Sequence, residues 1–121
     1  NISSFPLDVT DKTKKNKGTI VNLLFNYGSR QEISDAIVKI KKIDRPSNNF
    51  KKYLYVPDSK DPDLIIRTGG EKRLSNFYLW QSSYSELFFS DKLWPDFNVK
   101  DFDIALEDFR SRKRKFGVET G

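Results

Sequence analysis

Three short apolar runs, separated by segments with helical periodicity, constrain the fold of this chain more than any other feature. The runs cover residues 20–25, 64–66 and 86–89, and each is rich in residues that favour strands. Apolar side chains recur at helical spacing between the first two runs, over residues 29–40, and again after the third, over residues 102–115. Strands that alternate with amphipathic helices predict an α/β fold, with a mostly parallel sheet flanked by helices.

The ends of the two helical segments carry local signals. Ser29 and Glu32 have the spacing of a capping box, which predicts a helix start there. Asp101 is expected to stabilise the start of the last helix, and Gly117 is expected to stop it. Residues 50–56 fit either a short helix or an extended segment.

Three parallel strands are few for a sheet that helices must cover on both faces. We therefore expect half of a larger domain, and a chain without methionine is not expected to be a complete primary translation product. The predicted organisation has a polar, basic linker or remnant of a preceding segment over residues 1–18. The domain part then covers residues 19–117, and a tail covers residues 118–121.

Two composition values limit the chemistry, because the chain contains no cysteine and no histidine. Disulfides, zinc sites built from these residues, thiol nucleophiles and histidine-based triads are excluded. A metal would need carboxylate or other oxygen ligands, which favour ions such as Mg²⁺. The net charge of +5 permits anionic partners without naming one. The sequence has neither an apolar run long enough for a membrane span nor a visible signal peptide.

The segment that follows the second predicted strand carries the clearest chemistry. Arg67, Gly69, Gly70, Arg73 and Ser75 fall within nine residues. Arginines bind phosphate oxygens, glycines let backbone N–H groups approach an anion, and Ser75 adds a hydroxyl that could also cap a short helix over residues that follow it. The pattern is neither a Walker A loop nor a dinucleotide fingerprint, so a phosphate site and a plain turn with solvated charges are about equally supported.

Glu86 and the basic C-terminal end of the last helix are weaker candidates. Glu86 begins the third predicted strand, where it could hold a divalent ion, although an edge charge facing water is the simpler interpretation. The cations at the C-terminal end of the last helix could bind phosphate groups. For most of them, however, a solvated helix end that complements the macrodipole is the better interpretation. These cations are Arg110, Arg112, Lys113, Arg114 and Lys115.

Several of these motifs together resemble the C-terminal half of the cis-prenyltransferases, the undecaprenyl diphosphate synthase family. The resemblance runs over residues 18–117 and includes NYGSR at 26–30 and a final RKRKFG at 112–117. Its most specific part is DLIIRTGGEKRLSNF at 63–77, followed by LWQSSYSELFF at 79–89 and LWPDF at 93–97.

The resemblance implies successive cis-condensation of isopentenyl diphosphate onto an allylic diphosphate such as farnesyl diphosphate. The product would be a polyprenyl diphosphate that carries cell-wall glycans. By position in the motif, Arg67, Arg73 and Ser75 would bind isopentenyl diphosphate, and Glu86 would help to hold Mg²⁺ there. The family also implies a homodimer, whose tail reaches the partner's site, and a cytoplasmic enzyme with peripheral contact at the inner face of the membrane.

The chain departs from the family pattern in places. This sequence shows no match to the family's N-terminal half. That half carries the Asp-Gly-Asn-Gly-Arg motif, whose Asp organises the metal and the allylic diphosphate. We therefore assign no catalytic residue and expect the isolated chain to be a poor catalyst. The Arg-x-Gly tail is Lys115-Phe116-Gly117 here, and Ser29 replaces the commoner glycine. A non-catalytic, partner-binding subunit or degenerate fragment is the alternative, and a nucleic-acid-binding module ranks far below both because no such motif is present.

Overall fold

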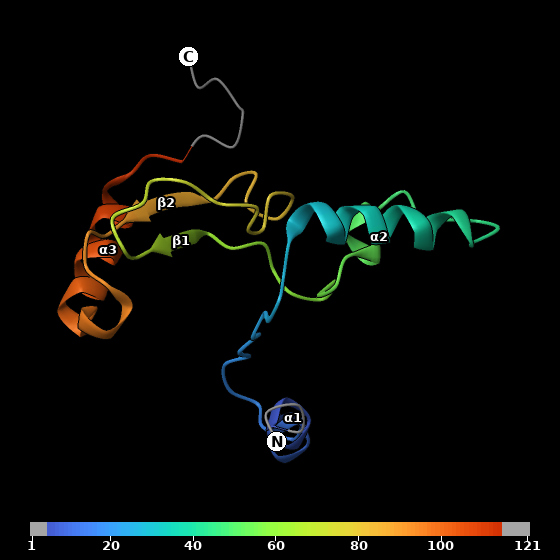
Figure 1. Ribbon diagram of the computed structural model, residues 1–121, viewed down its shortest axis with the longest axis horizontal. Coiled ribbons are helices and arrows are strands. Elements are labelled where there is room, and N and C mark those ends of the chain that lie inside the picture. The colour runs from blue at the N-terminus through green and yellow to red at the C-terminus, as the bar shows by residue number, and fades with distance from the viewer. Residues whose placement is uncertain (1–4, 115–121) are drawn as a thin grey trace.

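The computed structural model describes residues 5–114, which form three α-helices and one two-stranded sheet (Figure 1). The α-helices and strands are, in chain order, α1 (Phe5–Thr13), α2 (Ser29–Lys41), β1 (Leu64–Arg67), β2 (Glu86–Phe89) and α3 (Val99–Ser111). Two short 3₁₀ turns lie at Phe50–Tyr53 and Trp94–Asp96. Residues 115–121, which include the predicted stop at Gly117, the Lys115–Gly117 end and the 118–121 tail, lie outside the described part of the chain, as do residues 1–4.

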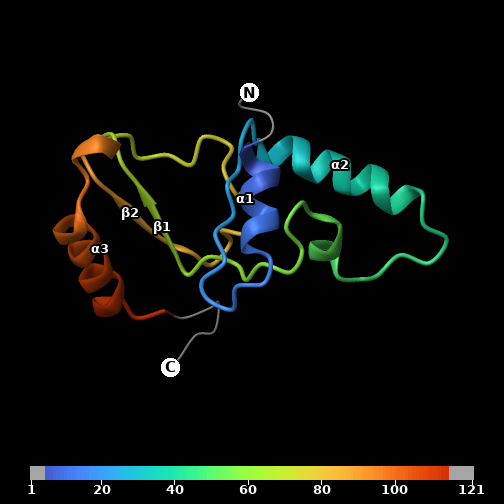
Figure 2. The ribbon, with the colours of Figure 1, turned by 90° about the horizontal axis from the view of Figure 1, so that it is seen from below.

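The sheet confirms the predicted parallel α/β arrangement. β1 and β2 pair in parallel, with Leu64 opposite Glu86 and Arg67 opposite Phe89. Helix α3 packs against β2, and Figures 1 and 2 both show it alongside the sheet, at the end away from α2. The carboxyl ends of the two strands therefore share one edge of the sheet, and the loops that follow them lie together.

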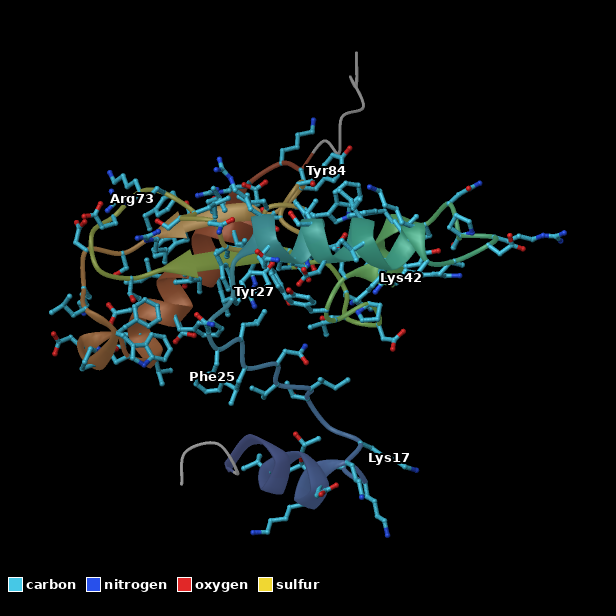
Figure 3. All side chains as sticks on the ribbon, turned by 45° about the vertical axis from the view of Figure 1, so that its right-hand side comes forward. Lys17, Phe25, Tyr27, Lys42, Arg73 and Tyr84 are labelled. Carbon is cyan, nitrogen blue, oxygen red and sulfur yellow. The ribbon has the colours of Figure 1, made fainter. Side chains whose placement is uncertain are left out.

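The prediction of a buried strand over residues 20–25 is wrong for the chain as the structure describes it. The segment is irregular, and Ile20 and Phe25 are 84% and 71% exposed. Figure 3 shows Phe25 on the connection between α1 and α2, which runs clear of the sheet. The strand-forming side chains are present, but a buried strand also needs a neighbouring strand and a covering layer. In the described part of the chain β1 pairs only with β2, so neither is supplied.

The predicted linker contains a helix, because residues 5–13 form α1 rather than an irregular arm. Figure 1 shows this helix apart from the sheet and from α2. It is a short helix, and its Thr13 hydroxyl donates to the carbonyl of Val9 near its end at 2.8 Å. Within the described residues no helix is both long and apolar enough to cross a membrane.

Helix α2 begins at the predicted residue, but not through the predicted capping box. Gly28 is the N-cap and makes no side-chain cap. Ser29 is fully buried, and its hydroxyl accepts a hydrogen bond from the Leu79 N–H at 2.9 Å. Glu32 is also fully buried and points into the protein instead of back to the cap. Both side chains are held by contacts that are distant in sequence, which a local capping pattern cannot reveal.

Glu32 joins three parts of the chain. Its carboxylate accepts hydrogen bonds from the Tyr55 N–H at 2.9 Å, from the Gln81 amide at 3.1 and 3.3 Å, and from the Tyr27 hydroxyl. Burial, and then the hydrogen bond to Glu32, raises the pKa of Tyr27 to about 12. Tyr27 therefore stays protonated and donates to Glu32 throughout the physiological pH range. A small apolar core lies beside this cluster, with Ala36, Tyr53 and Leu54 buried against Ile40 and Phe50.

Three shorter predictions are also settled. The ambiguous segment 50–56 contains the 3₁₀ turn Phe50–Tyr53, capped by the Asn49 side chain. The short helix that Ser75 could cap, over residues 76–84, does not form, because the segment is a series of turns in which Asn76 and Tyr78 have positive φ. Helix α3 ends at Ser111 instead of near residue 115.

The expectation that Asp101 stabilises the start of α3 is confirmed. The Asn98 side chain accepts from the Lys100 N–H at 3.0 Å, and Asp101 accepts from the Asn98 N–H at 2.9 Å, which completes a capping box. Lys92 lies 2.7 Å from the other oxygen of Asp101. The hydrogen bond from Lys92, and then that from Asn98, lowers the pKa of Asp101 below its ordinary value of 3.8.

This lowered pKa predicts a loss of stability in acid. The folded chain favours the charged carboxylate, so Asp101 contributes stability above pH 3.8 and loses that contribution as the pH falls through its folded pKa. We expect Asp101→Asn to lower the free energy of unfolding at neutral pH, and we expect the difference from the unmodified protein to shrink on acidification. Denaturant unfolding measured over a pH series tests this, and a difference that stays constant from pH 7 to pH 2 would contradict it.

Candidate functional site

The carboxyl end of β1 borders a cavity of about 390 Å³, named here the β1 cavity. Its polar lining comes from Arg67, Thr68, Arg73 and Ser75. Its apolar lining comes from Ile65, Ile66, Leu74 and Phe77. The structure therefore brings three of the four predicted site residues to one cavity, at the edge of the sheet where open α/β folds bind ligands.

Arg67 is the organising side chain of the β1 cavity. It is the last residue of β1, and its guanidinium donates to the Ser75 hydroxyl at 3.0 Å and to the backbone carbonyl of Arg73. These bonds fold the 68–75 loop back toward the strand that it leaves. Arg67 thus fixes the positions of Arg73 and Ser75 as well as supplying a positive charge.

Arg73 lies at the rim of the cavity, and Figure 3 shows it at the end of the molecule opposite Lys42. Its side chain is 61% exposed and forms an ion pair with Glu71, itself 51% exposed. An exposed ion pair is held weakly, so an anion with two negative charges can compete with Glu71 for the guanidinium. Arg73 is therefore the cation best placed to bind a ligand from solvent.

The twin glycines have a different role from the one expected. Gly69 and Gly70 have φ values of 95° and 78°, which few other residues adopt. Their N–H groups donate to the carbonyls of Lys92 at 2.7 Å and Ser90 at 2.9 Å. These N–H groups are already used, so the expectation that they approach an anion is wrong. The glycines instead allow a bend that ties the loop after β1 to the loop after β2.

The other end of the loop is tied to α2, and sequence reasoning missed the residue that does this. Asn76 accepts hydrogen bonds from the Ser29 N–H through its backbone carbonyl and from the Arg30 N–H through its side chain. Asn76 and the neighbouring Ser75 both have positive φ, at 65° and 48°. The available signal was the residue type, because asparagine tolerates left-handed backbone better than most residues.

Glu86 is not brought to the β1 cavity. It lies opposite Leu64, three residues before the level of Arg67, or about 10 Å along the strand. Its carboxylate pairs with Arg112 at 2.8 Å, and Arg112 also pairs with Asp108 at 2.6 Å. The hydrogen bonds that Arg112 donates to Glu86 and then to Asp108 raise the pKa of Arg112.

The acidic residues do not by themselves form a metal centre. Over residues 5–114 there is no group of three or more His, Cys, Asp or Glu side chains that could hold an ion. Glu86 offers one carboxylate, and that carboxylate is occupied by Arg112. The described residues therefore do not fit a self-contained Mg²⁺ site, and any such site needs ligands from elsewhere.

Two of the basic residues after α3 are in ion pairs rather than in a solvated patch. Arg112 bridges Glu86 and Asp108, and Arg114 contacts Asp63 and the carbonyl of Tyr84 at 3.2 Å. The pairs with Glu86 and Asp63 bind the residues after α3 to the amino-terminal edge of the sheet. Arg110 fits the expected role, because it lies in the last turn of α3 where a cation complements the helix dipole.

Comparisons with known proteins agree on one family. The family described as "Putative undecaprenyl diphosphate synthase" matches residues 4–117. An isoprenyl transferase of Thermotoga maritima is 52% identical in an alignment of 117 positions that covers 91% of this chain and 50% of that protein. A farnesyl-diphosphate-specific ditrans,polycis-undecaprenyl-diphosphate synthase of Buchnera aphidicola is 45% identical, over 97% of this chain and 51% of its own length.

Two solved structures are similar in fold as well as sequence. A probable undecaprenyl diphosphate synthase from Campylobacter jejuni has a TM-score of 0.82 and 39% identity, covering 97% of this chain and 56% of its own. Lavandulyl diphosphate synthase from Lavandula x intermedia, in complex with dimethylallyl diphosphate, has a TM-score of 0.86 and 36% identity. That match covers 93% of this chain and 52% of the other. The chain spans about half the length of the curated relatives it matches.

Proposed function

This chain belongs to the undecaprenyl diphosphate synthase family, and on that premise we propose that it forms the isopentenyl diphosphate side of a cis-prenyltransferase active site. The full enzyme would condense isopentenyl diphosphate with an allylic diphosphate such as farnesyl diphosphate, giving a polyprenyl diphosphate lipid carrier. The observation that supports this most is the convergence of Arg67, Arg73 and Ser75 on the β1 cavity.

The lining of the β1 cavity matches the two chemical parts of isopentenyl diphosphate. Arg73 and Arg67 are the cations for the diphosphate, and Ser75 adds a hydroxyl that donates to a phosphate oxygen. The apolar wall of Ile65, Ile66 and Phe77 suits a C5 hydrocarbon. We propose that the diphosphate lies at the rim of the β1 cavity and that the C5 hydrocarbon packs against β1.

Mg²⁺ is part of the proposal only for the complete enzyme. When bound it would offset the negative charge of the diphosphate and of the leaving group. Glu86 is the one predicted ligand on this chain. Because it lies outside the β1 cavity, it would have to exchange its Arg112 partner for the metal and come closer to the bound diphosphate. The other ligands would have to come from substrate oxygens or from protein outside the described residues.

The assembly and location of the enzyme are proposals by family resemblance. We propose a homodimer in the cytoplasm, with peripheral contact at the inner face of the membrane, where a polyprenyl product would be used. A mass measurement of the full-length enzyme in solution tests the dimer. A monomer at micromolar concentration would contradict it.

The experiment that tests the function is incorporation of labelled isopentenyl diphosphate by a full-length enzyme that carries this sequence. Farnesyl, geranylgeranyl and dimethylallyl diphosphate are supplied as separate primers, with and without Mg²⁺. We expect chain elongation with at least one primer. A folded full-length protein that binds no isopentenyl diphosphate and elongates no primer would favour the alternative, a non-catalytic partner-binding subunit.

A further inference from the structure

We propose that Asn76 is a positioning residue for the diphosphate-binding part of the β1 cavity, because it fixes the Arg73–Ser75 segment to the N-terminus of α2. The inference rests on the proposed function, since the ligand it concerns is the diphosphate of isopentenyl diphosphate. Asn76 lies between Ser75 and Phe77, which both line the β1 cavity, but it does not line the cavity itself. It is therefore placed to act through its neighbours and not by touching substrate.

Asn76 supplies the cap that α2 lacks. The first N–H groups of a helix have no partner within the helix, and the N-cap Gly28 provides no side chain for them. The Asn76 carbonyl accepts from the Ser29 N–H at 2.8 Å, and its side-chain oxygen accepts from the Arg30 N–H at 2.9 Å. One residue, 46 positions away from Arg30, thus satisfies two successive helix N–H groups.

The same contacts hold Ser75 in a backbone conformation that serine seldom adopts. Ser75 has φ of 48° and Asn76 has φ of 65°. Such residues persist only where the surrounding structure determines them, and they are found preferentially at binding sites. This conformation directs the Ser75 hydroxyl to Arg67, 3.0 Å away. Arg67 contacts the Ser75 hydroxyl from one side, and the bonds of Asn76 to α2 fix the backbone on the other side.

Gly28 makes the approach of Asn76 possible. Its backbone is extended, with φ of −146°, so glycine is not needed there for conformational reasons. A Cβ atom at this position, however, would lie 2.9 Å from the Asn76 side-chain nitrogen. The absent side chain of Gly28 therefore leaves room for the Asn76 amide against the start of α2. This gives a way to displace Asn76 without altering the loop itself.

The test uses three variants of a full-length enzyme that carries this sequence. Asn76→Ala removes the side-chain cap and the residue type that tolerates positive φ, so the KM for isopentenyl diphosphate should rise about tenfold. Asn76→Asp keeps an acceptor oxygen and tolerates the same backbone, so it should restore the KM to within about twofold. Gly28→Ala should raise the KM by an intermediate factor, and it carries the test if Asn76→Ala does not fold. For all three, the KM for the allylic primer and kcat should change little.

A matched control separates positioning from stability. Asn98 is also an asparagine that caps a helix, at the start of α3 and outside the β1 cavity. Asn98→Ala should lower the thermal midpoint about as much as Asn76→Ala does, while leaving the KM for isopentenyl diphosphate unchanged. If Asn76→Ala lowers the midpoint but leaves this KM unchanged, the inference is overturned. It is also overturned if Asn76→Asp raises the KM as much as Asn76→Ala.

The outcome for Arg73→Ala in the same series distinguishes the two proposals. If Arg73→Ala raises the KM for isopentenyl diphosphate and Asn76→Ala does not, the proposed function stands and the positioning role is wrong. If neither substitution changes the KM for isopentenyl diphosphate, the assignment of the β1 cavity to this substrate is wrong. A rise in both, with rescue by Asn76→Asp, supports the positioning role.

Discussion

Replacing Arg73 with alanine is expected to raise the KM for isopentenyl diphosphate by about 10- to 100-fold in a full-length enzyme that carries this sequence. The substitution removes a guanidinium that lies at the rim of the β1 cavity and forms an exposed ion pair with Glu71. Hydrogen bonds to charged groups contribute about 1.5–3 kcal/mol each, which corresponds to this range. Steady-state kinetics with saturating allylic primer measures it.

Lys72 provides the matched control for Arg73. It is the neighbouring residue, it carries the same charge and it is exposed, but it does not line the β1 cavity. Lys72→Ala should change the KM by less than about twofold, because exposed charges contribute little. Arg73→Lys should give an intermediate KM, since an ammonium keeps the charge and loses the forked geometry. Equal KM values for Arg73→Ala and Lys72→Ala would contradict the role given to Arg73.

Replacing Glu32 with alanine is expected to lower the free energy of unfolding by about 3 kcal/mol or more. The carboxylate is fully buried and accepts hydrogen bonds from Tyr27, Tyr55 and Gln81. Its removal leaves the buried Gln81 amide and the partly buried Tyr27 and Tyr55 donors without their partner, and an unsatisfied buried donor costs about 1–3 kcal/mol. Denaturant unfolding of the full-length enzyme measures the change.

Asp35 is the control for Glu32, because it is a carboxylate on the same helix with partners near the surface. It accepts from the Gln31 amide at 2.9 Å and from the Tyr55 hydroxyl. Asp35→Asn retains an acceptor oxygen and should lower the free energy of unfolding far less than Glu32→Ala does, because interactions of exposed charges contribute little. If the two substitutions lower the free energy of unfolding equally, Glu32 is not the residue that holds the surrounding loops to α2.

The strands show which parts of the sheet could be predicted from sequence patterns in this chain. The strands at residues 64–66 and 86–89 were predictable because their apolar runs pair with each other inside the chain. The run at residues 20–25 has an equally strong pattern, yet it is irregular and exposed, since the described residues provide no neighbour for it. Strand propensity is local, whereas strand formation depends on a partner.

The site shows a similar division between residue type and contact. The spacing of Arg67, Arg73 and Ser75 was enough to predict that they act together. The hydrogen bonds from the Gly69 and Gly70 N–H groups to the carbonyls of Lys92 and Ser90 could not be predicted. The two loops are distant in sequence, and they lie together because β1 and β2 pair.

The residues at the start of α2 were assigned to the wrong interaction. Ser29 and Glu32 match a capping box in sequence, but contacts with Leu79, Tyr55 and Gln81 override it. The cap comes instead from Asn76, which no local pattern connects to this helix. Tertiary hydrogen bonds of buried polar groups decided between the two arrangements, because an unpaired buried carboxylate would be costly.

A structure of the full-length enzyme with isopentenyl diphosphate bound is the measurement that tests the account most directly. The account predicts phosphate oxygens within hydrogen-bonding distance of the Arg67 and Arg73 guanidinium groups and of the Ser75 hydroxyl, with the C5 group against Ile65 and Ile66. A diphosphate bound elsewhere, with Arg73 still paired to Glu71 and the β1 cavity without ligand, would contradict it.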